Sequence, residues 1–118
     1  MHLFIKSRAA LLLLYLSIAS ALRPSDIPTD TPVSSLISSA KAHLASGEPR
    51  EALLYFDAAV ARDPSNYLTL FQRGATYLSL GKDAQATEDF NRVLELKPGF
   101  EEALVQRSRI RTRSGDWK

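Results

Sequence analysis

Apolar residues recur along most of the chain at spacings of three and four positions, as in amphipathic helices that bury one face. Glycines and prolines interrupt this pattern at regular places. Proline is tolerated at the first position of a helix, where Pro32 and Pro49 lie, and glycine supplies the left-handed backbone that often ends one. Thr31 is placed to cap the first helix. The pattern therefore predicts an all-α chain with helices over about residues 32–46, 49–62, 66–80, 83–96 and 100–115.

The interruptions repeat with a period of 34 residues, as Gly47, Gly81 and Gly115 show. The same spacing relates further pairs of residues, namely Ala52 with Ala86, Phe56 with Phe90, and Pro64 with Pro98. One helix pair cannot bury its apolar face alone, so stacked neighbours make the core of such a chain. We therefore expect a solenoid of antiparallel helix pairs, with repeats over residues 33–66 and 67–100 and the first helix of a third over 101–118.

Side-chain size predicts how the helices pack. Three small residues are expected where two helices approach closely: Ala52, Gly74 and Ala86. Five large residues are expected to fill the space between pairs: Phe56, Leu70, Tyr77, Phe90 and Leu104. The last helix is expected to cap the stack by covering Leu94 and Leu96 with Leu104 and Ile110.

These positions together resemble the tetratricopeptide repeat (TPR), whose second helix carries an alanine, an aromatic residue and another alanine before a final proline. The first repeat matches at Ala52, Phe56, Ala59 and Pro64. The second matches at Gly74, Tyr77, Ala86, Phe90 and Pro98, with Val93 in place of the usual second alanine. The resemblance covers residues 33–118 and implies a TPR solenoid whose first helices line a groove.

The N-terminus differs from the rest of the chain. Lys6 and Arg8 precede an apolar run over residues 9–22, and Ala19 and Ala21 form a small-residue cleavage site. The run has 14 residues, fewer than the about 20 that a membrane-spanning helix needs. We predict a signal peptide over residues 1–21, no stable membrane anchor, and a proline-rich linker over residues 22–31. A retained signal anchor and a cytosolic apolar helix are the alternatives.

Charge and candidate chemistry point away from catalysis and nucleic acid. The net charge of +2 is accounted for by Lys6 and Arg8 of the predicted signal peptide, so the rest of the chain is balanced. The arginines at 107, 109, 111 and 113 fall on two flanks of a helix, which is not a phosphate-binding stripe. Cysteine is absent, and His43, expected to face the neighbouring helix, is the one histidine beyond the predicted signal peptide. We predict a protein that is not an enzyme, with no cofactor, no metal and no nucleic-acid partner.

A closer resemblance follows from the predicted signal peptide, which is unusual ahead of TPRs. The runs over residues 56–67 and 103–108 resemble the N-terminal repeats of the endoplasmic-reticulum TPR/J-domain co-chaperone family. In that family the repeats hold unfolded clients, and a C-terminal J domain stimulates the lumenal chaperone BiP. This sequence has no His-Pro-Asp motif of a J domain. The resemblance implies a fragment of such a co-chaperone, located in the endoplasmic reticulum lumen, that reaches BiP through a J domain absent from this chain.

The register of the first helices predicts which residues line the groove. The expected client-binding residues are Ile37, Lys41, Leu44, Leu68, Phe71, Gln72, Leu78 and Val105. The stripe is mostly apolar and suits exposed apolar segments of unfolded or misfolded polypeptides, or else packs against neighbouring helices. A carboxylate clamp for acidic peptide ends is disfavoured, because only Lys41 is basic there and Glu102 has the wrong sign. The alternative function is a secretory-pathway TPR scaffold that binds one defined folded partner.

Overall fold

The computed structural model describes residues 23–115, so the predicted signal peptide and the last three residues lie outside the described part. This part is helical and contains no strand, which confirms the predicted all-α class. Its elements are a short 3-10 helix η1 (Pro24–Asp26) and five α-helices: α2 (Val33–Ala45), α3 (Pro49–Arg62), α4 (Tyr67–Ser79), α5 (Asp83–Leu96) and α6 (Glu101–Ser114). The α-helices agree with the predicted ones except at their terminal residues.

The start of α2 differs from the prediction that Thr31 caps it. Pro32 is the N-cap residue, and its carbonyl accepts a hydrogen bond from the Leu36 amide at 3.1 Å. The carbonyl of Thr31 instead accepts a hydrogen bond from the guanidinium of Arg62 at the end of α3. Thr31 thus makes a tertiary contact, which local sequence does not reveal, instead of capping the helix. The predicted start of α3 at Pro49 is confirmed.

Glycine ends α2 and α4 as predicted. Gly47 and Gly81 have φ angles of 74° and 73°, in the left-handed region. The Lys82 amide then donates to the Tyr77 carbonyl at 2.9 Å, which satisfies a carbonyl that the end of the helix leaves free. Each of these turns reverses the chain and so places the second helix of a pair against the first.

Replacing Gly81 by alanine is expected to lower the free energy of unfolding by about 1–2 kcal/mol, because a Cβ disfavours the left-handed backbone. Nothing lies within 4 Å of the added Cβ, so the loss reports backbone strain rather than a clash. Urea denaturation followed by circular dichroism measures it. Gly81→Asn is the matched control, because asparagine tolerates this conformation, and its loss should be clearly smaller. Equal losses for both variants would contradict the explanation.

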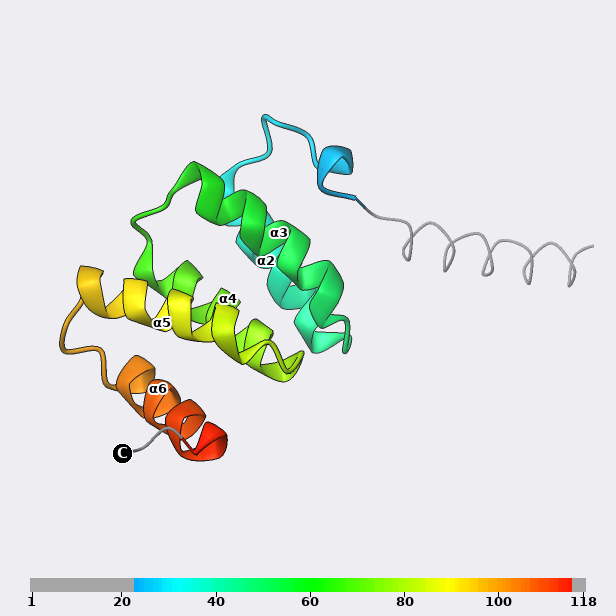
Figure 1. Cartoon of the computed structure of the whole chain (residues 1–118). Coiled ribbons are helices and arrows are strands. Elements are labelled where there is room, and N and C mark those ends of the chain that lie inside the picture. The colour runs from blue at the N-terminus through cyan, green and yellow to red at the C-terminus, as the bar shows by residue number, and fades with distance from the viewer. Residues whose placement is uncertain (1–22, 116–118) are drawn as a thin grey trace, which may run out of the picture.

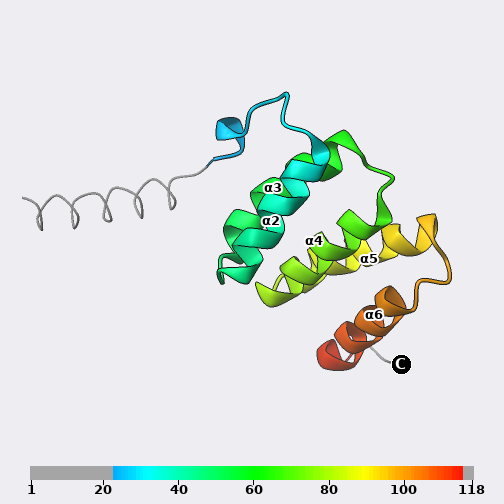
Figure 2. The ribbon, with the colours of Figure 1, turned by 180° about the vertical axis from the view of Figure 1, so that it is seen from behind.

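Two helix pairs, α2 with α3 and α4 with α5, stack along the chain, and α6 follows on α5 (Figure 1). Helices α3 and α5 are nearer the viewer in Figure 1, whereas α2 and α4 are nearer in the reversed view of Figure 2. The first helices of the pairs therefore share one side of the stack, and this is the side on which the groove was expected.

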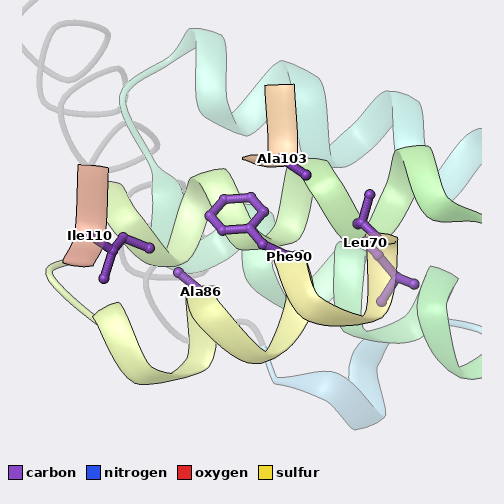
Figure 3. Close-up of a cluster of buried hydrophobic side chains, with 6 residues drawn as sticks. Leu70, Ala86, Phe90, Ala103 and Ile110 are labelled. Atoms are coloured by element: carbon purple, nitrogen blue, oxygen red, sulfur yellow. The ribbon is translucent and has the colours of Figure 1, made fainter. Parts of the chain in front are cut away.

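Buried side chains form two clusters. The larger one joins α4, α5 and α6 (Figure 3) and consists of Leu70, Ala86, Phe90, Val93, Ala103 and Ile110. The smaller one joins α2 and α3 through Ala40, Ala52 and Phe56. The predictions for Ala52, Phe56, Ala86 and Phe90 are confirmed, because all four are fully buried. Tyr77 is half-buried against the larger cluster.

The prediction that Leu104 fills the core is wrong. Leu104 is 41% exposed, whereas Leu70, 34 residues earlier, is 3% exposed. Helix α5 packs against the side of α4 that carries Leu70, and the described part of the chain has no helix in the equivalent place beside α6. Leu94 and Leu96 pack against the larger cluster, to which Ala103 and Ile110 belong, so α6 covers the end of the stack through Ala103 and Ile110.

The predicted linker lies against α3 over its described residues, 23–31. The guanidinium of Arg62 donates hydrogen bonds to the backbone carbonyls of Pro28, Thr29 and Thr31. Ile27 shares a shallow hollow with Ala58 and Ala61 of α3. The segment has no core of its own and is held to the first helix pair by these contacts.

Candidate protein-binding groove

Two adjoining hollows lie along the first helices of the pairs, and together they are named the groove here. The first hollow, of about 230 Å³, lies between α2 and α4 and is lined by Leu44, Phe71, Gln72, Ala75, Thr76 and Ser79. The second, of about 300 Å³, lies between α4 and α6 and is lined by Phe71, Glu101, Glu102, Val105, Gln106 and Arg109. Phe71 lines both hollows, so the three helices contribute to one continuous surface.

The structure brings four of the eight predicted client-binding residues together in the groove: Leu44, Phe71, Gln72 and Val105. Leu78 packs against the larger core cluster and does not line either hollow. The others do not line the hollows: Ile37 is half-buried, and Lys41 and Leu68 are exposed. The surface is thus narrower than the predicted stripe, and the role of its residues in binding stays a prediction.

Phe71 is a fixed floor for the groove. Its ring centroid lies 5.6 Å from that of Phe90 and 5.3 Å from that of Phe100, with an edge-to-face arrangement at Phe100. Leu44 and Val105, on either side, are 37% and 47% exposed. A ring that is held by the core loses little freedom when a ligand contacts it, so the groove is largely preformed.

The two hollows differ in charge. No ionisable side chain lines the first hollow, which suits an apolar ligand segment. Glu101, Glu102 and Arg109 surround Val105 in the second hollow. The second hollow therefore offers hydrogen bonds and charge at the rim of an apolar contact.

Sequence reasoning missed an ion-pair network that holds the floor of the groove in place. Arg73 donates to both carboxylate oxygens of Asp89, from Nε at 2.8 Å and from Nη2 at 2.7 Å. Its Nη1 donates to Oδ1 of Asp57 at 3.2 Å. Asp89 is only 4% exposed. Arg73 thus ties α4 to both α3 and α5, next to the segment that carries Phe71 and Gln72.

The network shifts several pKa values. The hydrogen bonds from Arg73 to Asp89 raise the pKa of Arg73, which remains charged at any accessible pH. Burial raises the pKa of Asp57 in spite of the opposing attraction of Arg73. Burial, followed by the nearby charge of Asp57, also raises the pKa of Tyr77. These shifts act on folding, since none of the three residues lines the groove.

The sequence does contain a signal for this network, namely opposite charges 16 residues apart, which is about half of the 34-residue repeat. Both carboxylates lie 16 residues from Arg73, one on each side. The 34-residue period relates Arg73 and Asp57 to Arg107 and Asn91, and Arg107 Nη1 donates to Asn91 Oδ1 at 3.0 Å. A search for charged pairs at half-repeat spacing would have found the network.

Comparison with known proteins agrees with this geometry. The tetratricopeptide repeat family profile matches residues 68–100, which contain most of α4 and all of α5. The chain is a tetratricopeptide-repeat protein. MamA is 21% identical, with a TM-score of 0.71 over 75% of this chain and 52% of that one. The second TPR of Spaghetti (RPAP3), solved with an HSP90 peptide, is 23% identical, with a TM-score of 0.67 over 70% of this chain and 77% of that one. Both show that the fold is shared.

The relatives of this TPR protein include a J domain-containing co-chaperone and DnaJ homologues. It is 57% identical over 117 residues to the TPR and J domain-containing co-chaperone DNJ1 of Fusarium oxysporum, covering 99% of this chain and 22% of the relative. It is 40% identical over 72 residues to rat DnaJ homolog subfamily C member 3, covering 61% of this chain and 14% of the relative. The predicted resemblance to TPR/J-domain co-chaperones is confirmed, whereas the location in the endoplasmic reticulum stays a prediction. The chain is a TPR module of the DnaJ-type co-chaperone family and spans 22% of the Fusarium protein and 14% of the rat protein.

Residues 23–115 of the TPR protein form neither a metal site nor a membrane-spanning helix. No three of its described His, Asp and Glu side chains gather closely enough to hold a metal ion. None of the described helices has the length and hydropathy needed to cross a bilayer.

His43 stacks on Tyr55 of α3 with ring centroids 5.2 Å apart, and its Nδ1 lies 3.7 Å from Oε1 of Glu48. The prediction that His43 faces the neighbouring helix is confirmed.

Proposed function

We propose that this TPR module binds exposed apolar segments of unfolded or misfolded polypeptides in the lumen of the endoplasmic reticulum. It acts there as part of a co-chaperone that delivers these clients to a BiP-type chaperone through a J domain. One observation carries the binding function: the ring of Phe71 is the fixed floor of two adjoining hollows whose outer sides are the exposed Leu44 and Val105.

The groove fits an extended apolar segment better than an acidic peptide end. Leu44, Phe71 and Val105 offer apolar contacts on three successive first helices, which a segment crossing the helices can reach. Glu101 and Glu102 would repel a carboxylate in the second hollow, where Arg109 is the one cation among the lining residues. Shallow hollows with few polar requirements also suit clients of varied sequence.

Two further features support the lumenal location and the delivery to BiP. Residues 1–21 have the basic start, apolar run and small-residue site of a secretory signal peptide. The Fusarium relative is named as a J domain-containing co-chaperone, and its match covers 99% of this chain. The proposal assigns the delivery step to a J domain of the kind that the name of the Fusarium relative states, and this sequence itself contains no His-Pro-Asp motif.

The second candidate function is a scaffold for one defined folded partner in the secretory pathway. The charged side chains around Val105 favour a folded partner. Glu101, Glu102 and Arg109 can pair with polar groups that such a partner holds in fixed positions. The two functions differ in what they require of the ligand, since a folded partner presents one shape and a client presents unfolded chain.

Replacing Leu44 and Val105 together by glutamine is expected to weaken client binding by about tenfold or more, since each substitution removes part of the buried apolar area. The probe is fluorescently labelled α-lactalbumin, reduced and carboxymethylated so that it stays unfolded, and its affinity is measured by fluorescence anisotropy. Both side chains are substantially exposed, so the fold should survive the change. Phe71 is unsuitable for this test, because its ring also packs on Phe90 and Phe100.

Leu104→Gln is the matched control, because Leu104 is 41% exposed but does not line the groove. It should leave the affinity for unfolded α-lactalbumin unchanged, and native α-lactalbumin should not bind to any of the three proteins. Equal loss in the control and the double variant would show that the groove is not the client site. Failure of the wild-type protein to bind unfolded chain would favour the scaffold.

A further inference from the structure

We propose that the first hollow of the groove is an anchor pocket that takes one aromatic side chain of a client polypeptide. The inference rests on the proposed client-binding function and adds the class of side chain that this surface selects. The hollow lies between α2 and α4, has a volume of about 230 Å³, and is lined by six described residues, among them Leu44, Phe71 and Ala75. Both helices belong to pairs that the structure describes over their whole length.

The hollow exists because α4 has small side chains where the neighbouring repeats have long ones. Ala75 and Ser79 are both exposed, line the hollow and lie about one helical turn apart on α4. The 34-residue period relates Ala75 to Lys41 in the first repeat and to Arg109 in the third. Alanine therefore leaves space on α4 at a position where α2 and α6 carry a long side chain.

The size and the floor of the hollow suit an aromatic ring. An apolar protein cavity of about 150 Å³ holds one benzene molecule, and this hollow has about 230 Å³. Phe71 lines it with a ring that Phe90 and Phe100 hold in place. Aromatic pairs attract one another beyond the apolar area that they bury, in offset or edge-to-face arrangements. An aromatic side chain that enters between Leu44 and Phe71 therefore gains more than an aliphatic one.

The hydroxyl groups that line the hollow need no partner from the ligand. The Thr76 hydroxyl donates to the Gln72 carbonyl at 2.8 Å, and the Ser79 hydroxyl donates to the Thr76 carbonyl at 2.7 Å. An apolar side chain that covers them leaves neither donor unsatisfied. None of the six described lining residues is ionisable, so a charged side chain would lose hydration there without gaining an opposite charge. The hollow therefore selects an uncharged, apolar side chain.

The test compares two fluorescein-labelled peptides. The Trp peptide is Gly-Ser-Gly-Leu-Trp-Leu-Gly-Ser-Gly, and the Leu peptide has leucine in place of the tryptophan. Both are titrated with the full chain, and binding is followed by fluorescence anisotropy. The wild-type protein should bind the Trp peptide at least about threefold more tightly than the Leu peptide, as for one added aromatic contact. Equal affinities, or no binding of the Trp peptide at about 1 mM, would overturn the assignment.

Ala75→Leu fills the hollow from within and so separates a pocket from a general apolar surface. It should weaken binding of the Trp peptide about tenfold and remove the preference over the Leu peptide, because the new side chain takes the place of the ligand. If apolar area alone attracted the client, the added leucine would strengthen binding instead. Ala75 is exposed and leucine is favourable in helices, so the fold should survive. Ser79→Leu fills the same hollow one turn further along α4 and should have the same effect.

Ala84→Leu is the matched control, because Ala84 is exposed on α5 and lines neither hollow. It should leave both affinities unchanged, and equal losses in Ala84→Leu and Ala75→Leu would overturn the assignment. Unfolded α-lactalbumin separates this inference from the proposed function. If it binds the wild type while the two peptides bind equally, the anchor pocket is wrong and the client site remains. If it does not bind, the proposed function fails, and the assignment of the pocket to clients fails with it.

Discussion

Replacing Asp89 by asparagine is expected to lower the free energy of unfolding by about 3 kcal/mol, near the lower end of the range for breaking a buried ion pair. The substitution keeps the size of the side chain but removes the charge that both Nε and Nη2 of Arg73 contact. Asp57, which is half-exposed, would then be the only charged partner that Arg73 keeps. A loss of this size is a large share of the stability of a small domain. Urea denaturation followed by far-ultraviolet circular dichroism measures it.

Asp57→Asn is the matched control on the same arginine. The side chain of Asp57 is 50% exposed, so its pair with Arg73 is worth less than about 1 kcal/mol. Because burial raises the pKa of Asp57, the folded chain binds this proton more tightly than the unfolded chain. The contribution of that proton to stability is complete below the unfolded pKa and is lost as the pH rises through the folded pKa. Asp57→Asn should remove this part of the pH dependence, and equal losses for the two variants at neutral pH would contradict the ranking.

Local rules explain why the helices and turns could be predicted from the sequence. The left-handed backbone at Gly47 and Gly81, and the start of α3 at Pro49, depend on residue types that allow few conformations. The 34-residue period then predicted that residues 34 positions apart have the same burial. This prediction is confirmed where the same helices lie beside both residues. Phe56 and Phe90, for example, are both fully buried.

The period failed where the neighbours of the two copies differ. Leu104 has the sequence position of Leu70 but lacks a helix beside it in the described part, so its exposure is set by what lies next to α6. The sequence also could not show which of the predicted groove residues line the two hollows, for a related reason. Leu78 and Phe71 both follow the helical register of one face and both pack against the larger cluster, but only the packing of α4 on its neighbours shows that Phe71 also lines the two hollows.

Gly74→Val is expected to lower the free energy of unfolding by about 3 kcal/mol, the upper end of the usual cost of overpacking a core. A Cβ at this position would lie 2.8 Å from Cε1 and 3.1 Å from Cζ of Phe90, and 3.2 Å from Cβ of Asp89. Phe90 is fully buried and is surrounded by the larger cluster, so its ring cannot turn away without opening a cavity. Thermal and urea unfolding of the variant and the wild type measure the loss.

Gly99→Val separates the clash from the general effect of valine, because nothing lies within 4 Å of a Cβ at Gly99 and no positive φ is required there. Its stability should stay within about 0.5 kcal/mol of wild type, as for most surface substitutions. A double variant tests the cause directly: Phe90→Leu removes the ring atoms nearest to Gly74, so Gly74→Val should cost less in that background than in the wild type. If the two losses are equal, the contact with Phe90 is not the reason for glycine at this position. If Gly74→Val costs less in the Phe90→Leu background, the ring of Phe90 opposite Gly74 is the reason that the close approach of α4 and α5 requires glycine at this position.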